Sequence, residues 1–199
     1  MLVEPRPTTR TPSRWTAALL GVLLISCSDT DQFSPPRASL LTSELTFLRF
    51  TDDAYQAAEK SASFWAVKGE SRTLVLRYAD TGQEYLKFQV GPSTLVDHDS
   101  VLINVAVDAA GNFAFHFSPS GLRFNPYAPA SLALNHARTN GDIDADGDVD
   151  LIDAARSLGA GVWKRELPVT PWLRIPSVNL GVVQRSDVYD FTSFGMAVD

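Results

Sequence analysis

The clearest pattern in the chain is the alternation of apolar and polar positions through its middle. In residues 84–90, Leu86, Phe88 and Val90 share one face of an extended segment. The positions between them give the other face Tyr85, Lys87 and Gln89. An antiparallel strand with one face in the core and the other in water has this alternation. The pattern therefore predicts a half-buried β-strand over residues 84–90.

Further strand-like segments lie on both sides of this one. They occupy residues 63–67, 72–78, 100–107, 112–117, 130–136, 172–175 and 188–198. Short segments that contain glycine separate several of them, at residues 68–69, 80–82, 91–92 and 110–112. Many short strands with turns at this spacing predict an all-β fold, an immunoglobulin-like β-sandwich. We expect one domain, over residues 41–199.

Two parts of this domain follow a different pattern. Residues 41–50 fit either a strand or a helix, whereas residues 52–60 begin with two aspartates and fit a short helix. Residues 154–158 also predict a short helix. It directly follows the most acidic stretch of the chain.

The first 26 residues have the pattern of an export signal. Arg6, Arg10 and Arg14 precede nine apolar or small residues, 17–25. This run is too short to cross a bilayer, which requires about 20 residues. Its end, Leu-Ile-Ser-Cys27, resembles the lipobox of bacterial lipoproteins, and the resemblance implies cleavage before Cys27 and lipid attachment to it. Cys27 is the only cysteine, so it has no disulfide partner in the chain.

The lipobox resemblance places the protein in the cell envelope, lipid-anchored to a bacterial membrane on the periplasmic side or at the cell surface. Residues 27–40 are polar and contain prolines, which suits a tether between lipid and domain. The whole chain has a formal net charge of −6. Without residues 1–26 it has 14 basic and 22 acidic residues, and a net charge of −8. This acidity argues against a nucleic-acid partner.

The most specific chemistry lies in residues 142–153, DIDADGDVDLID. Its six acidic residues are Asp142, Asp144, Asp146, Asp148, Asp150 and Asp153. Five of them fall at positions 1, 3, 5, 9 and 12 of an EF-hand calcium loop, and Gly147 falls at the sharp turn of position 6. Calcium takes six to eight oxygen ligands at roughly 2.3–2.6 Å, and such a loop supplies them. We therefore expect Ca²⁺ as the cofactor.

The remaining positions of the loop have expected roles as well. Asp148, at position 7, is expected to offer its backbone carbonyl, and Asp150 to bind directly or through water. Val149 is expected to anchor the loop to the core, together with Leu151 and Ile152. A solvated acidic turn is the alternative, because Asp and Gly are common in turns. Without a cation, however, six like charges in twelve residues repel one another.

Asp153 stands where an EF-hand usually has glutamate, and a short helical pattern follows it. In both respects the stretch resembles the loop and exit helix of a bacterial dockerin repeat. Dockerins carry two such repeats, whereas this chain has one, and its entering segment, residues 130–136, alternates like a strand. A cohesin partner is therefore not expected.

A second resemblance covers residues 63–198. Phe117-Ser-Pro119-Ser-Gly121-Leu-Arg-Phe124 and the following Pro-Ala resemble a turn and strand opening of the ZU-five domain of ankyrins and netrin receptors. Residues 190–197 are similar to that family's closing strand. The resemblance implies a ZU-five-like β-sandwich used as a structural or contact module, without catalytic residues. The calcium loop and its short helix would then be an insertion at about residues 139–162, and long insertions are uncommon unless functional.

Enzymatic motifs are weak in this chain. His98, His116 and His136 form no local ligand spacing, and Ser120 lacks the first glycine of a nucleophile elbow. The loop aspartates could serve as a glycosidase acid and base, but metal spacing accounts for all of them at once. Six aromatic residues fit either a sandwich core or sugar stacking: Trp65, Trp163, Trp172, Tyr78, Tyr85 and Tyr127.

These observations favour a non-enzymatic, calcium-binding envelope lipoprotein with a structural or interaction β-sandwich. The alternative is a calcium-dependent binding module for envelope polysaccharide or a protein partner. A hydrolase with a calcium-supported fold is a third hypothesis, for which the sequence offers no nucleophile.

Overall fold

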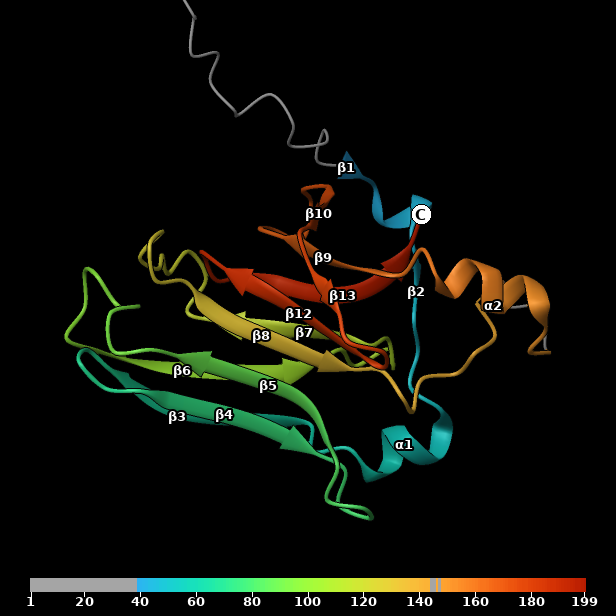
Figure 1. Ribbon diagram of the computed structural model, residues 1–199, viewed down its shortest axis with the longest axis horizontal. Coiled ribbons are helices and arrows are strands. Elements are labelled where there is room, and N and C mark those ends of the chain that lie inside the picture. Colours follow the sequence, from blue (N-terminus) through green and yellow to red (C-terminus); the bar gives the residue numbers. More distant parts are fainter. Residues whose placement is uncertain (1–38, 144–145, 147) are drawn as a thin grey trace, which may run out of the picture. The chain divides into compact units, whose positions relative to one another are not determined.

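The computed structural model describes residues 39–143, 146 and 148–199 (Figure 1). They belong to a single structural unit, Pro36–Asp199. The predicted signal, Cys27, nearly all of the predicted tether, and Asp144 and Gly147 of the predicted loop lie outside the described residues. No helix within the described residues has the length and apolar character needed to cross a membrane.

Two antiparallel sheets dominate the described residues, as the strand pattern predicted. The first sheet has the order β1-β10-β9-β13-β7-β6-β3, with β2 also paired to β13. Its strands are β1 (Ser39–Leu40), β2 (Thr46–Phe47), β3 (Ser61–Val67), β6 (Ser100–Val107), β7 (Ala114–Ser118), β9 (Gly161–Arg165), β10 (Trp172–Ile175) and β13 (Ser193–Val198).

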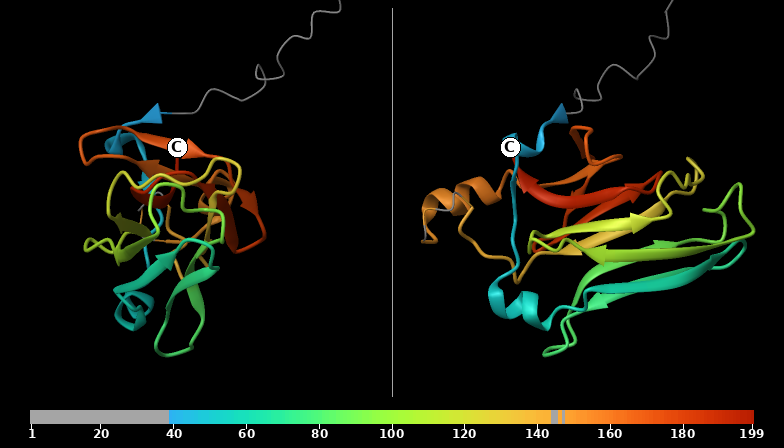
Figure 2. Two further views of the ribbon diagram at one scale, coloured as in Figure 1. Left: turned by 90° about the vertical axis from the view of Figure 1, so that its left-hand side faces the viewer. Right: turned by 180° about the vertical axis from the view of Figure 1, so that it is seen from behind.

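The second sheet has the order β11-β12-β8-β5-β4. Its strands are β4 (Arg72–Arg77), β5 (Glu84–Val90), β8 (Ala130–Asn135), β11 (Val178–Asn179) and β12 (Val183–Val188). The helices are η2 (Thr42–Glu44), α1 (Asp52–Ala57) and α2 (Leu151–Ser157). Both α1 and α2 lie at the same end of the strands, as the opposite views in Figures 1 and 2 show.

The main core fills the space between the sheets and is rich in phenylalanine. In β5, the alternating Leu86, Phe88 and Val90 are buried as predicted. Tyr85 is buried too, although strict alternation would turn it outward. The pairing of β4 with β5 shifts here, from Leu76 opposite Leu86 to Arg77 opposite Glu84, so Tyr85 is the extra residue of a bulge. A bulge re-aims a side chain in this way.

A second, smaller core lies on the outer face of the first sheet. It consists of Leu45, Trp163, Trp172 and Ala197, with Leu40 and Phe47 packed against it. Phe47 lies so close to the sheet that a Cβ on Gly195 would come within 2.8 Å of its ring. The side chains of Leu40, Leu45 and Phe47 therefore cover the β9 and β13 part of this face. The outer face of β3 and β6 is not covered by this smaller core.

Several segments differ from the sequence prediction. The short helix predicted at residues 52–60 forms only over Asp52–Ala57, as α1, whose N-cap Thr51 accepts a hydrogen bond from the Ala54 backbone N–H. Residues 188–198 do not form one strand, because β12 ends at Val188 and β13 begins at Ser193. Strands β9 and β11 and most of β12 were not predicted.

Candidate metal centre

The acidic loop connects the two sheets, because it leaves β8 of one and leads through α2 into β9 of the other. Its entry is tied to the segment that precedes α1. The Asn140 N–H donates to the Arg49 carbonyl at 2.7 Å, and the Arg49 N–H donates to Asn140 Oδ1 at 3.3 Å. At the exit, Arg174 Nη2 donates to the Gly159 carbonyl at 2.9 Å. Both ends of the loop are therefore fixed by the sandwich.

Asp150, at loop position 9, is the N-cap of α2. Its Oδ1 accepts hydrogen bonds from the backbone N–H groups of Ile152, at 2.6 Å, and of Asp153, at 3.2 Å. The first N–H groups of a helix lack partners within the helix, and an aspartate at the N-cap satisfies them. The same carboxylate thus starts the helix and faces the loop.

Asp153 closes the loop on itself. Its Oδ1 accepts from the Ile143 N–H at 2.6 Å, and its Oδ2 accepts from the Asp150 N–H at 3.0 Å. The side chain is buried, with 1% of its residue surface exposed. Loop position 12 is therefore joined to positions 2 and 9 by charge-assisted hydrogen bonds, which are the stronger kind.

Three of the predicted ligands come together: Asp148, Asp150 and Asp153 place carboxylate oxygens within 4.8 Å of one another. Asp148 contributes its side chain to this group, whereas the loop pattern predicted its backbone carbonyl. Asp146 instead accepts a hydrogen bond from the Asp148 N–H on its Oδ1, at 3.2 Å. Asp142 is not in the group. Asp144 is outside the described residues.

The donor chemistry of this cluster suits a hard divalent cation. All of its side-chain ligands are carboxylate oxygens, which calcium and magnesium prefer. An ionised carboxylate has about four lone-pair positions, so Asp150 and Asp153 can accept N–H donors and still face a cation. Three carboxylates this close repel one another when no cation is between them. Residues 148, 150 and 153 therefore fit a calcium ligand set in chemistry.

The predicted apolar anchors of the loop are wrong. Val149, Leu151 and Ile152 are 69%, 86% and 54% exposed. The residue that reaches the main core is Ile143, at loop position 2, which is 4% exposed. The hydrogen bond that the Ile143 N–H donates to Asp153 Oδ1 fixes the Ile143 backbone at this point, and α2 buries Asp153 rather than its own apolar residues.

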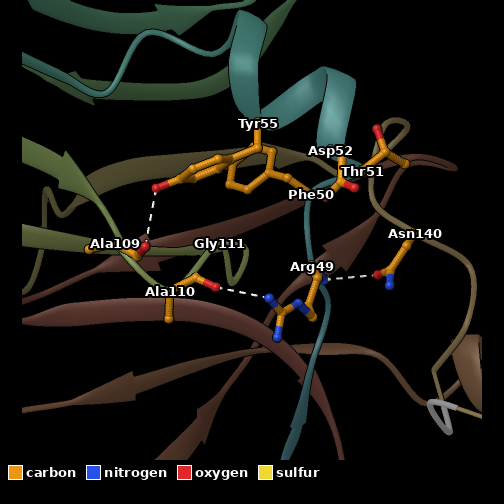
Figure 3. A pocket seen from close by; sticks show the side chains of 9 residues that line it. All are labelled: Arg49, Phe50, Thr51, Asp52, Tyr55, Ala109, Ala110, Gly111 and Asn140. Atoms are coloured by element: carbon orange, nitrogen blue, oxygen red, sulfur yellow. Dashed lines mark hydrogen bonds between the residues drawn. The ribbon is translucent and has the colours of Figure 1, made fainter.

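A hollow of about 410 Å³ lies beside the loop entry (Figure 3). Its lining includes Arg49 and Asn140, the pair that ties down the loop. Arg49 Nη2 donates to the Ala110 carbonyl at 3.0 Å, and the Tyr55 hydroxyl donates to the Ala109 carbonyl at 3.3 Å. Asp52 is the one carboxylate among its lining residues. The hollow therefore lacks the ligand set that the neighbouring loop offers.

A contact that the sequence did not predict involves His116 on β7. Its Nδ1 lies 2.9 Å from Ser193 Oγ, and its Nε2 lies 3.5 Å from Asp108 Oδ1. The residue types match a Ser-His-Asp relay. The distance to Asp108 is too long for a good hydrogen bond, and Asp108 accepts a hydrogen bond from Asn112 Nδ2 at 2.8 Å instead. The pairing of β13 with β7 places Ser193 opposite His116, and the spacing of these residues in the sequence gives no indication of the contact.

The aromatic residues that fitted either a core or sugar stacking divide clearly. Tyr78, Tyr85, Trp163 and Trp172 are buried in the two cores. Trp65 is 58% exposed and Tyr127 is 96% exposed.

Comparison with known proteins identified no relative of this chain. Neither the protein-family models nor the curated proteins nor the solved structures yielded a match to this chain.

Proposed function

We propose that this protein is a non-enzymatic, calcium-binding lipoprotein of the bacterial cell envelope. A lipid on Cys27 would hold it to the membrane, and one calcium ion would order the loop of residues 142–153. The observation that carries the proposal is the convergence of the Asp148, Asp150 and Asp153 carboxylates within 4.8 Å. It falls in the segment whose sequence already has calcium-loop spacing.

The finer family assignment is part of the same proposal. A ZU-five-like or immunoglobulin-like sandwich is supported by the contacts of the two motifs that carry the resemblance. Phe191 packs against Phe117 and Phe124, with ring centroids 5.2 Å and 4.9 Å apart. The loop and α2 then form a dockerin-like insertion in the connection between β8 and β9.

At the proposed envelope location, a calcium site of low affinity is sufficient for occupancy. Calcium is abundant outside the cytosol, so a dissociation constant of about 10⁻⁴–10⁻³ M permits occupancy there. A ligand at ten times its dissociation constant that binds only the folded state adds about 1.4 kcal/mol of stability. In a domain of this size that corresponds to a rise in Tm of roughly 3–6 °C.

Calorimetry of the full-length protein in mild detergent tests the proposal. EGTA should lower Tm, calcium should restore it, and magnesium at the same concentration should not. Asp148→Ala, which removes an exposed member of the convergent group, should remove the calcium-dependent shift. Absence of both a shift and a binding signal at millimolar calcium would refute calcium binding.

A second candidate function is a calcium-dependent binding module for an envelope polysaccharide or a protein partner. It is favoured by the exposure of Val149, Leu151, Ile152 and Leu158 on the loop and α2. Such a module should lose its ligand in EGTA and in the double variant Leu151→Ser, Ile152→Ser. Ligand capture that survives both changes would contradict it.

A further inference from the structure

The outer face of the first sheet is open over β3, β6 and β7. A hollow of about 480 Å³ lies over these strands. The outward residues that line it are Ser61, Ser63, Asn104, Ala106, His116 and Ser118. The side chains of Leu40, Leu45 and Phe47, which cover β9 and β13, are not among the residues that line it. The result is a broad, shallow site on a rigid sheet.

Strand pairing arranges these side chains in rows across the sheet. Ser63 is opposite Asn104, which is opposite Ser118, and Asn104 Nδ2 donates to Ser118 Oγ at 3.2 Å. The next row contains Ser61, Ala106 and His116. All of these side chains are small or of moderate size, which makes the floor of the hollow lower than its surroundings.

An indole ring stands at one end of the rows. Trp65 follows Ser63 on the same face of β3, about 6.6–6.8 Å further along the strand. It pairs with Leu102 of β6, and both side chains are exposed. An exposed indole offers a flat apolar face to a ligand. It gains from an apolar face that packs on it.

The charge of this face differs from that of the rest of the molecule. Every outward residue of β3 and β6 is uncharged, in a chain with a net charge of −6. The outer face of the second sheet, by contrast, carries Lys87, Arg185 and Asp187. One carboxylate lies beside this face, because Asp108 Oδ1 is 3.5 Å from His116 Nε2, and it disfavours an anionic polymer. A neutral ligand with many hydroxyls would meet hydroxyl, amide and imidazole groups.

The polar groups are already held in place. His116 Nδ1 lies 2.9 Å from Ser193 Oγ, while 46% of the His116 side chain remains exposed. Asn104 is held by Ser118. Side chains fixed before binding lose less conformational entropy when a ligand arrives, which favours affinity.

We propose that the outer face of β3, β6 and β7 binds a neutral polysaccharide chain, with Trp65 stacking on a sugar ring and Asn104 and His116 hydrogen-bonding its hydroxyls. A pyranose ring presents C–H groups on its faces and hydroxyls at its edge, which matches an indole beside a polar floor. The site shares no residue with the calcium loop. It stands whether or not that loop binds calcium.

The test uses the full-length protein in mild detergent and a panel of soluble polysaccharides. Dextran, laminarin, mannan, galactan and xylan are the neutral members, and polygalacturonate and dextran sulfate are the charged ones. Affinity electrophoresis and calorimetry should detect at least one neutral member and neither charged one. Trp65→Ala should raise its Kd at least about tenfold, as expected when the main aromatic contact of a binding surface is lost. Asn104→Ala and His116→Ala should each raise it about two- to tenfold.

Matched variants separate this site from others. Tyr127→Ala removes an aromatic side chain that is exposed elsewhere, and it should leave Kd unchanged. Asp142→Ala with Asp146→Ala should also leave Kd unchanged, because it alters only the loop. The proposal is overturned if no neutral member binds, if a charged member binds instead, or if Trp65→Ala binds normally. Loss of binding in the loop variant alone would assign the glycan to the loop and would overturn it as well.

Discussion

Replacement of Asp153 by alanine separates the structural role of this carboxylate from its role as a cation ligand. In the folded protein its two oxygens accept the N–H groups of Ile143 and Asp150. Alanine leaves both N–H groups without this acceptor, at a place where the side chain was buried. The variant should therefore be less stable than the wild-type protein even when EGTA has removed all calcium.

The magnitude follows from the two hydrogen bonds. A hydrogen bond to a charged group contributes about 1.5–3 kcal/mol, so the loss of two costs about 3 kcal/mol at the lower end. For a domain of this size, each kcal/mol lowers Tm by roughly 2–4 °C, which gives a decrease of roughly 6–12 °C. Asp153→Asn retains one carbonyl acceptor and should cost about half as much.

Asp148→Ala is the matched control, because Asp148 is an exposed member of the same cluster. In EGTA its Tm should equal or slightly exceed that of the wild-type protein, since one repelling charge has been removed. In calcium, both variants should lose the calcium-dependent rise. Scanning calorimetry of the wild-type protein and both variants, in EGTA and in calcium, measures these Tm values. Equal Tm values for Asp153→Ala and Asp148→Ala in EGTA would refute the structural role of Asp153.

Three further predictions concern packing and pH. Ile143→Ala should cost about 2–5 kcal/mol in denaturant unfolding because Ile143 fills the core, whereas Leu151→Ser at an exposed site should be neutral or stabilising. Burial lowers the pKa of His136 below its ordinary value of 6.5. The contribution of His136 to stability should therefore be fully present above pH 6.5 and should fall as pH drops through the folded-state pKa. Chemical denaturation at several pH values should show this slope, and His136→Gln should abolish it. Burial raises the pKa of Tyr78 to about 12, so its contribution to stability should be complete below pH 10 and should be lost as pH rises toward 12. In an ultraviolet titration Tyr78 should ionise only near pH 12, and its ionisation near the ordinary tyrosine value of 10 without unfolding would contradict the burial argument.

The sequence predicted strands best where one face is buried and the other is in water. Residues 84–90, 100–107 and 172–175 were predicted with the bounds that the structure has. Strand β12 was missed because two of its inward positions, Gln184 and Ser186, are polar although they are buried, so no alternation of apolar and polar residues marks the strand. Strand β9 was missed for another reason. Val162 faces the main core and Trp163 faces the smaller one, so both faces of β9 carry buried apolar residues and the strand lacks an alternation of apolar and polar positions.

At the candidate metal centre, the sequence could identify ligand types and spacing but not the direction of side chains. Aspartates at fixed intervals are visible in the sequence, and three of them do converge. The predicted anchors failed because loop periodicity does not show which side faces the sandwich. That side is set by contacts over long distances in the chain, such as those of Arg49 with Asn140 and of Arg174 with Gly159. The same limit explains why His116 and Ser193 were not paired in advance.

These contacts also determine how much a calcium ion could change. The loop ends are fixed by the sandwich, Asp150 already caps α2, and Asp153 already holds Ile143 in the core. The described ends of the loop are therefore held by hydrogen bonds in the absence of an ion, so little of the binding free energy is spent on ordering the backbone at these ends. The charge repulsion among Asp148, Asp150 and Asp153 remains, and its relief is what a cation would supply. Calcium should therefore stabilise the loop locally and shift Tm by only a few degrees, without a large change in secondary structure. A large gain of circular dichroism on calcium addition would indicate a loop that is unfolded without the ion, contrary to the hydrogen bonds described above.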